Sequence, residues 1–224
     1  MNRSEINRYI EEAISFFDKF YFRLPPWAYF SPDEWKTRGM EYLEIKENML
    51  GWDLTDFGSG NFEKTGLLLF TLRNGKPGHP VFRKTYAEKI MIVRDRQITP
   101  THFHWQKMED IINRGGGRLC IQLWKSAVDE TLSSELFTVQ IDGVTHQVNA
   151  GDIVRLKPGE SICLEPYVYH KFWAENGMTM VGEVSMVNND VNDNRFLEPV
   201  GRFPEITEDE PAQYLLCTEY PDFN

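Results

Sequence analysis

Two histidines and a glutamate within one short stretch are the residues whose types and spacing best suit chemistry. His102 and His104 are separated by one residue, and Glu109 follows five positions after His104. On a β-strand, side chains at i and i+2 point to the same face and lie about 7 Å apart. Both imidazoles can therefore face one interior point while Phe103 packs on the opposite face. A polar bend at 105–108 would return the chain and bring Glu109 beside them.

Two imidazole nitrogens and a carboxylate oxygen are typical ligands of a divalent metal ion, and they suit several first-row metals. The chain has only five histidines, and the other three are His79, His146 and His170. His79 lies in a Gly/Pro-rich loop and His146 in a predicted hairpin, so we expect neither of them to bind metal.

The elements that must position these ligands are short strands. After residue 50, Gly, Pro and Asn recur at short intervals, and the apolar runs shrink to strand length at 67–72, 90–93, 119–124 and 153–156. The clearest signal is Asp142-Gly143 between two alternating runs, 137–141 and 144–148, which predicts a hairpin with a tight turn. Many short strands without interleaved long helices predict an antiparallel sandwich or barrel.

Two glycine-containing segments are predicted as turns. Glu175-Asn176-Gly177 separates the strands expected at 170–174 and 178–186. Gly115-Gly116-Gly117 lacks the strand and helix context of a phosphate-binding loop, so it too is interpreted as a turn.

The N-terminal fifty residues have a different pattern. Apolar residues recur at helical spacing over 4–20, which predicts an amphipathic helix whose apolar stripe packs on the barrel or on a partner subunit. Ser31, Pro32 and Glu34 form the start signal of a second, short helix. We therefore expect residues 1–50 to be a helical extension packed on the barrel. Residues 51–224 would form the β-barrel with a C-terminal wrap, and the whole chain one structural domain.

Composition excludes several classes of function. The net charge is −10, with 34 acidic and 24 basic residues, and no Lys/Arg stripe stands out, which disfavours nucleic acid or an anionic membrane as a partner. Three widely spaced cysteines do not form a disulfide framework or a zinc ribbon. The charged N-terminus does not look like a signal peptide, and no apolar run approaches the roughly 20 residues of a membrane span. The sequence therefore predicts a cytoplasmic protein.

A second segment makes the histidine pattern specific. Gly151, Pro158-Gly159 and His170 resemble the second cupin motif, and His102-x-His104-x4-Glu109 resembles the first. The resemblance implies a mainly β fold, a cupin-type antiparallel β-barrel (jelly roll) with N-terminal helices. It also implies that one divalent ion is held inside the barrel by a set of four ligands, His102, His104, Glu109 and His170.

The flanking residues resemble the D-lyxose isomerases of the cupin superfamily along nearly the whole chain. Distinctive strings are His102-Phe-His-Trp105, Asn113-Arg-Gly-Gly-Gly117, the tail at 201–211 and Leu24-Pro-Pro-Trp27. The resemblance implies a metal-dependent aldose–ketose isomerase that interconverts D-lyxose and D-xylulose, and also D-mannose and D-fructose. It implies Mn²⁺ as the ion, with Co²⁺, Fe²⁺, Ni²⁺ and Zn²⁺ open, and a homodimer.

Such an isomerisation moves one proton between C2 and C1 through an enediol, so a general base must lie within hydrogen-bond reach of the carbon-bound proton. Glu109 is a poor base because its charge is committed to the ion. The candidates are Lys107, whose pKa a nearby cation would lower, and Glu205, in a tail that could fold over the barrel mouth. The sugar hydroxyls need polar partners, for which the candidates are Lys89, Glu183, Asp193 and Arg195.

Two other functions stay open at this point. One is an Fe²⁺-dependent cupin dioxygenase, in which O₂ takes the open metal position. The other is a non-catalytic sugar-binding cupin. A lysine and an acid beside the metal suit proton transfer better than oxygen activation, and this favours the isomerase. The choice of base and the preference for a pentose or a hexose stay open.

Overall fold

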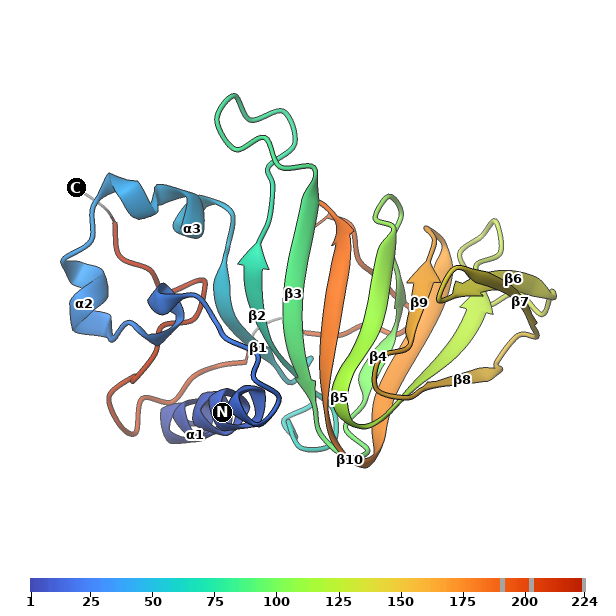
Figure 1. The fold of residues 1–224 in the computed structure, drawn as a ribbon, viewed down its shortest axis with the longest axis horizontal. Coiled ribbons are helices and arrows are strands. Elements are labelled where there is room, and N and C mark those ends of the chain that lie inside the picture. The colour runs from blue at the N-terminus through green and yellow to red at the C-terminus, as the bar shows by residue number, and fades with distance from the viewer. Residues whose placement is uncertain (190–191, 202–203, 223–224) are drawn as a thin grey trace.

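A computed structural model gives the fold and describes residues 1–189, 192–201 and 204–222. Helices occupy the N-terminal part, and the first strand begins at Gly51. The helical elements are α1 (Arg3–Lys19), η1 (Pro26–Tyr29), α2 (Pro32–Lys36), η2 (Met40–Tyr42) and α3 (Leu43–Glu47). Figure 1 shows them gathered at one side of a strongly curved sheet.

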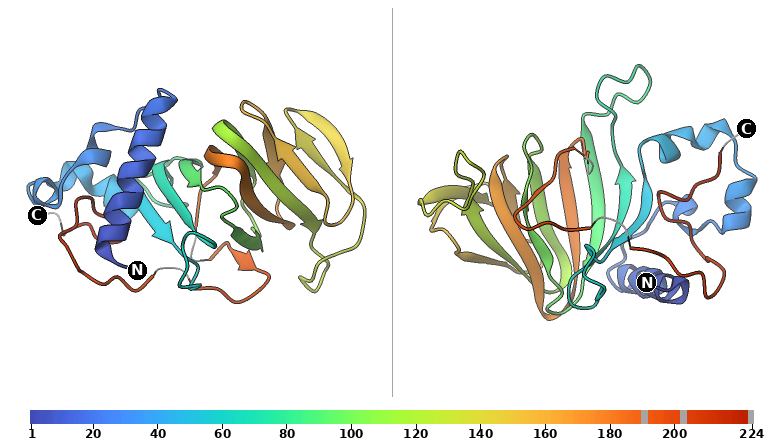
Figure 2. Two further views of the ribbon diagram at one scale, coloured as in Figure 1. Left: turned by 90° about the horizontal axis from the view of Figure 1, so that it is seen from below. Right: turned by 180° about the vertical axis from the view of Figure 1, so that it is seen from behind.

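The rest of the chain is dominated by antiparallel strands. They are β1 (Gly51–Thr55), β2 (Leu67–Arg73), β3 (Tyr86–Val93), β4 (Thr99–Phe103), β5 (Glu109–Lys125), β6 (Phe137–Ile141), β7 (Val144–Val148), β8 (Ile153–Leu156), β9 (Ser161–Leu164), β10 (Val168–Met186) and β11 (Arg195–Phe196). The main path is β1-β2-β3-β10-β5-β9-β6-β7, while β4 pairs with β10 and β11, and β8 pairs with β5. The two long strands β5 and β10 lie side by side and connect β1-β2-β3 on one side of the sheet to β9-β6-β7 on the other (Figure 2).

Helix α1 forms where the apolar spacing predicts it, and its stripe is used within the chain. Asn2 and Glu5 make a capping box at its start. Ile6, Ile10 and Phe17 are buried in a cluster with residues of β1, β2 and β3. The helix therefore covers the outer face of this part of the sheet, as Figure 1 shows, and its stripe does not need a partner subunit for burial.

Local signals in the sequence are confirmed at the hairpin and at the second helix. Asp142 and Gly143 have φ of 49° and 79°, the left-handed values that a two-residue turn of this type requires, and they join β6 to β7 at the predicted residues. Ser31 accepts a hydrogen bond from the Glu34 backbone N–H at the start of α2.

The two predicted glycine turns are wrong, because both segments lie inside long strands. Gly115–Gly117 belongs to β5 and Glu175–Gly177 to β10, and the pairing register between these strands shifts at this place. A Cβ built on Gly116 would lie 2.2 Å from the Met178 carbonyl oxygen. The glycines thus permit a close approach of two bent strands, and the chain does not reverse there.

Gly116→Ala is expected to destabilise the protein by at least about 2 kcal/mol, since it combines a strained φ with a clash against backbone. The φ of Gly116 is 96°. Chemical denaturation measures the effect. Gly143→Ala is the matched control, because Gly143 also has a positive φ but no atom lies within 4 Å of its added Cβ. Equal losses for both variants would contradict the close-approach explanation.

The C-terminal segment forms the extended wrap that its composition predicts. It returns across the helical side of the molecule, where Thr207 bridges Asn2 and Leu216 bridges Trp52 (Figure 2). Among the helices that the structure describes, none is both long and apolar enough to cross a membrane.

Arg3 fastens this wrap to the first turn of α1. Its guanidinium is buried and lies 2.6 Å from a Glu208 carboxylate oxygen and 2.5 Å from one of Glu219. We expect Arg3→Ala to lower the free energy of unfolding by about 2 kcal/mol, because charge-assisted hydrogen bonds are lost. Arg8→Ala, which removes an exposed pair with Glu12, is the control in the same denaturation series and should cost under about 0.5 kcal/mol. Similar losses of unfolding free energy for the two variants would contradict a special stabilising role of the Arg3 ion pairs.

The core inside the curved sheet continues into the region of the predicted ligands. Leu69, Met91, Ile111 and Phe172 belong to this buried core. Four strands then supply the chemistry-bearing side chains: β3, β4 with the bend that follows it, β5 and β10. Within this frame His102 on β4 pairs directly with His170 on β10.

Candidate functional site

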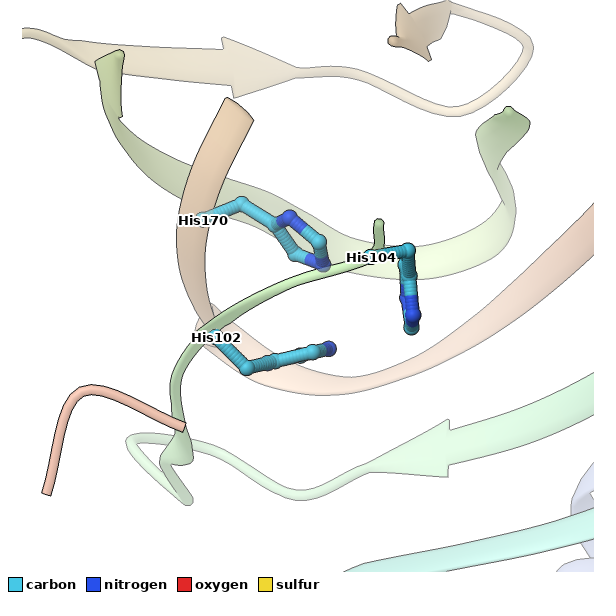
Figure 3. A group of neighbouring side chains, drawn as sticks. All are labelled: His102, His104 and His170. Atoms are coloured by element: carbon cyan, nitrogen blue, oxygen red, sulfur yellow. The ribbon is translucent and has the colours of Figure 1, made fainter. Parts of the chain in front are cut away.

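The structure brings three of the predicted ligands to one buried point. His102, His104 and His170 are 8%, 6% and 1% exposed, and their potential ligand atoms all lie within 4.8 Å of one another. Figure 3 shows the three imidazoles projecting from two segments toward a common space. A buried group of three histidines like this one could hold a metal ion.

Each histidine is held by its own backbone carbonyl partner. The Nδ1 atoms lie 2.8 Å from Pro100 O for His102, 2.6 Å from Asp193 O for His104 and 3.0 Å from Val168 O for His170. A carbonyl oxygen only accepts, so every Nδ1 carries the hydrogen and every neutral Nε2 keeps its lone pair. Outer hydrogen bonds of this kind orient imidazole ligands in metal sites and fix their tautomer.

Glu109, the first residue of β5, adds an oxygen to the nitrogens. Its Oε1 lies 3.4 Å from His104 Nε2 and 3.3 Å from His170 Nε2. Two ligands bound at about 2.1 Å to one ion lie roughly 3.0–3.5 Å apart when they are neighbours in its coordination shell. The distances from Glu109 to His104 and His170 therefore fit neighbouring ligands of one divalent ion, although Glu109 lies outside the group of three histidines whose ligand atoms are all within 4.8 Å of one another.

The environment favours the protonation states that such ligands require. Burial, together with the neighbouring His170, holds the pKa of His102 well below its ordinary value. Burial also lowers the pKa of His170 to about 4. For Glu109, burial by itself would raise the pKa, but Lys107 and the histidines hold it well below the usual range. Neutral imidazoles and an ionised carboxylate are the forms that bind metal.

Lys107 lies between two buried carboxylates. Its Nζ is 2.8 Å from Glu109 Oε2 and 3.0 Å from Glu183 Oε1. The bend between β4 and β5 supplies the lysine, while β10 supplies Glu183. Glu109 therefore presents one oxygen to the histidines and the other to the ammonium of Lys107, which links the two parts of the site.

The contacts of Glu183 with other described residues involve only one of its two carboxylate oxygens. Its Oε1 forms an ion pair with Lys107 and lies 3.5 Å from Lys89 Nζ. The same oxygen accepts a hydrogen bond from Ser185 Oγ at 3.2 Å. Within the described part of the chain, all the hydrogen bonds and ion pairs of this carboxylate fall on Oε1. Since Glu183 lines the cavity beside the histidines, its Oε2 is free to meet a bound molecule.

A cavity lies over these groups, and the empty space in it and in its open mouth together is about 590 Å³. The three histidines, Lys89, Lys107, Glu109 and Glu183 form its polar side. The rest of the lining is largely apolar and includes Phe57, Met91, Phe172 and Phe196, whose ring centroid lies 5.2 Å from that of His102. A lining that combines charged and apolar side chains suits a small molecule that has both hydroxyl groups and C–H surface.

Two of the four residues predicted to bind substrate lie elsewhere. The Asp193 carboxylate accepts hydrogen bonds from the backbone N–H groups of Gln106 and Lys107, at 2.9 Å and 3.0 Å. It therefore stabilises the bend between β4 and β5. Arg195 pairs with Glu130 at 2.8 Å. Neither residue is among the described residues that line the cavity, whereas Lys89 and Glu183 are.

The structure does not bring Glu205 to the site. Its side chain is exposed, and its backbone carbonyl accepts a hydrogen bond from the Met1 ammonium at 2.8 Å. It is absent from the described lining of the cavity. The tail runs along the helical side of the molecule, and for that reason this acid is not over the mouth of the barrel.

Sequence reasoning missed several residues that the structure places around the cavity. Ser185 and Asn188 contact the buried charged groups, while Phe57 and Phe196 form part of the wall. Ser185 had a usable signal, since it lies two positions after Glu183 on one strand face. Phe57 and Asn188 come from irregular segments, where no periodicity predicts the direction of a side chain.

The curved antiparallel sheet with its buried histidines defines a cupin-type fold, and comparison with solved structures agrees. The L-ribose isomerase of Cellulomonas parahominis superposes with a TM-score of 0.62 at 16% identity, covering 92% of this chain and 98% of that one. The predicted fold class, a mainly β cupin-type barrel with N-terminal helices, is confirmed.

Sequence comparison then identifies the family. The family model for D-lyxose isomerase matches residues 1–220. D-lyxose/D-mannose isomerases of Serratia proteamaculans and of Escherichia coli O157:H7 are 50% and 51% identical to this chain over 226 residues, covering all of it and 99% and 100% of their own lengths. The chain belongs to the D-lyxose isomerase family and is a sugar isomerase of the aldose–ketose class.

Proposed function

We propose that this protein interconverts D-lyxose with D-xylulose and D-mannose with D-fructose by moving a proton between C2 and C1. Full-length relatives at 50% and 51% identity carry the name D-lyxose/D-mannose isomerase, which supports the choice of sugars. The cavity lies directly beside the candidate metal ligands and the buried charged groups. Its apolar side chains would meet the C–H surface of the sugar.

His102, His104, Glu109 and His170 would hold one divalent ion, with Mn²⁺ as the first candidate. The observation that carries this assignment is the backbone carbonyl on each Nδ1, which leaves three Nε2 lone pairs turned to one point. When bound, such an ion supplies Lewis-acid chemistry that polarises a carbonyl and stabilises the charge that develops on its oxygen.

Glu183 is the general base of this proposal. Glu183 lines the cavity, and its Oε1 is fixed by Lys107 and Ser185, so we assign its Oε2 to the substrate. A carboxylate held by one oxygen can take the proton from C2 with the other and return it to C1 of the enediol. Lys107 donates a hydrogen bond to Glu183 and forms an ion pair with Glu109, so we assign it to orient both carboxylates and to donate to a substrate oxygen.

The same charged groups disfavour an iron dioxygenase. Four ionisable side chains meet beside the histidines: Lys89, Lys107, Glu109 and Glu183. Proton transfer uses such a network directly, while oxygen activation has no need of it.

The test is turnover by the metal-stripped protein after reloading with one divalent ion at a time. We expect D-lyxose to yield D-xylulose, and D-mannose to yield D-fructose, with the highest rate for Mn²⁺ and none for the stripped protein. Formation of ketose can be followed by ¹³C NMR of sugars labelled at C1. Absence of ketose with every divalent ion would refute the proposal, and oxygen uptake with Fe²⁺ would point to the dioxygenase.

Some predictions from the sequence extend past this reaction. The identity of the ion, a homodimeric state, a cytoplasmic location and the division at residue 50 remain predictions. The homodimer must use a surface other than the apolar stripe of α1, because Ile6, Ile10 and Phe17 are buried within the chain.

A further inference from the structure

Three asparagines connect the two buried lysines of the site to the rim of the barrel. Asn48 follows α3, Asn74 follows β2, and Asn188 follows β10. Asn48 and Asn74 are 3% and 6% exposed. These residues come from distant parts of the sequence, yet hydrogen bonds join them in a row that ends at Lys89 and Lys107.

Asn188 contacts both ammonium groups with one oxygen. Its Oδ1 accepts from Lys89 Nζ at 2.7 Å and from Lys107 Nζ at 3.3 Å. An ammonium group only donates, so the orientation of the Asn188 amide follows from its partners. On the other side, Lys89 Nζ lies 3.5 Å and Lys107 Nζ lies 3.0 Å from Glu183 Oε1. The two ammonium groups thus lie between this carboxylate oxygen and the Asn188 oxygen.

Asn74 in turn fixes the backbone of Asn188. Its Oδ1 accepts from the Asn188 backbone N–H at 3.0 Å, and its Nδ2 donates to the Asn188 carbonyl at 3.0 Å. One side-chain amide therefore satisfies both main-chain groups of Asn188, as a neighbouring strand would. Asn48 completes the row by donating from Nδ2 to the Asn74 carbonyl at 3.0 Å. The Asn188 side chain is consequently anchored from behind.

We propose that Asn188 is a positioning residue for the isomerisation, an inference that rests on the proposed function. It holds the ammonium groups of Lys89 and Lys107 against Glu183, which keeps Oε1 occupied and Oε2 turned to the substrate. The positive charges of the lysines then remain available to the carboxylates of Glu109 and Glu183.

The test compares Asn188→Leu, which is similar in size but has no acceptor, with Asn188→Asp, which keeps an oxygen at the same place. For Asn188→Leu we expect kcat to fall roughly 10- to 100-fold, the loss that misplacement by about 1 Å can cause. KM, bound metal and Tm should stay near the wild-type values. Asn188→Asp should recover most of kcat. Asn192→Leu replaces an exposed asparagine of the same segment and should behave as wild type.

A second measurement is independent of turnover. Acetylation of the folded protein, with lysine reactivity mapped by mass spectrometry, should show Lys89 and Lys107 reacting several-fold faster in Asn188→Leu than in the wild type or in Asn192→Leu. This outcome would support the positioning role even if the wild type fails to isomerise sugars, in which case only the proposed function falls.

Two outcomes would overturn the inference while the isomerase assignment stands. One is an Asn188→Leu protein with wild-type kcat and unchanged lysine reactivity. The other is a loss of kcat that parallels a loss of Tm and is not recovered in Asn188→Asp, since that pattern marks a general structural role.

Discussion

Replacing His170 by alanine is expected to lower kcat/KM at least about 10³-fold, because the metal site loses a ligand and the general base then works without a polarised carbonyl. His170 is 1% exposed, and its Nε2 lies 3.3 Å from Glu109 Oε1. Its removal also leaves the negative charge of Glu109 with one fewer partner. Metal content after dialysis, measured by inductively coupled plasma mass spectrometry, should drop in parallel with activity.

His146→Ala is the matched control for this experiment, because His146 is an exposed histidine on β7 and lies outside the described cavity lining. It should keep full metal content and activity. If His170→Ala retained one metal ion per chain and wild-type turnover, the assignment of this histidine as a ligand would have to be given up.

Glu183→Gln is the second substitution for which we expect a large loss of activity. The amide keeps the shape of the carboxylate but cannot take a proton, so we expect kcat to fall roughly 10²- to 10⁴-fold, the usual contribution of a positioned general base. Bound metal should be unchanged, since the ion pairs among the described residues join Glu183 to the ligand set through Lys107 and not directly. Steady-state kinetics and metal analysis of the same preparation distinguish loss of the base from loss of the ion.

Two other glutamates sharpen this test. Glu165→Gln is a control, because Glu165 is exposed and lies outside the described cavity lining. Glu205→Gln decides between the sequence-based candidate and the structural one. A large loss of kcat for Glu205→Gln, with none for Glu183→Gln, would return the role of base to the C-terminal tail.

Local sequence patterns predicted those parts of the fold that short-range physics determines. The tight turn at Asp142-Gly143 and the capping of α2 depend on a few neighbouring residues, and both are confirmed. The close spacing of His102 and His104 followed from the period of a strand. Their approach to His170 depends on the pairing of β4 with β10, and this contact was predicted from the family resemblance.

The errors arise where long-range pairing overrides local preference. Glycines at 115–117 and 175–177 carry turn-like signals, but the pairing of β5 with β10 makes them a bend shared by two strands. Glu205 lies away from the cavity for a related reason. An acid in an irregular tail carries no signal about its direction, and the wrap follows contacts with α1 and β1 that no periodicity reveals.

Glu183 was placed in the site from the sequence, although in a binding role. Nothing in a sequence shows which oxygen of a carboxylate is occupied. We propose proton transfer in place of substrate binding because of three contacts on Oε1. They involve Lys89, Lys107 and Ser185, which belong to three different segments.

The most direct test of the central claim, proton transfer by Glu183 beside the metal ligands, is isomerisation of D-lyxose in D₂O by the Mn²⁺-loaded protein, with the ketose analysed by NMR. An enediol mechanism predicts that deuterium from the solvent appears at C1 of the D-xylulose formed, because the proton rests on Glu183 and can exchange there. Ketose that forms at the full rate with no deuterium at C1 would indicate a hydride shift and would contradict the account.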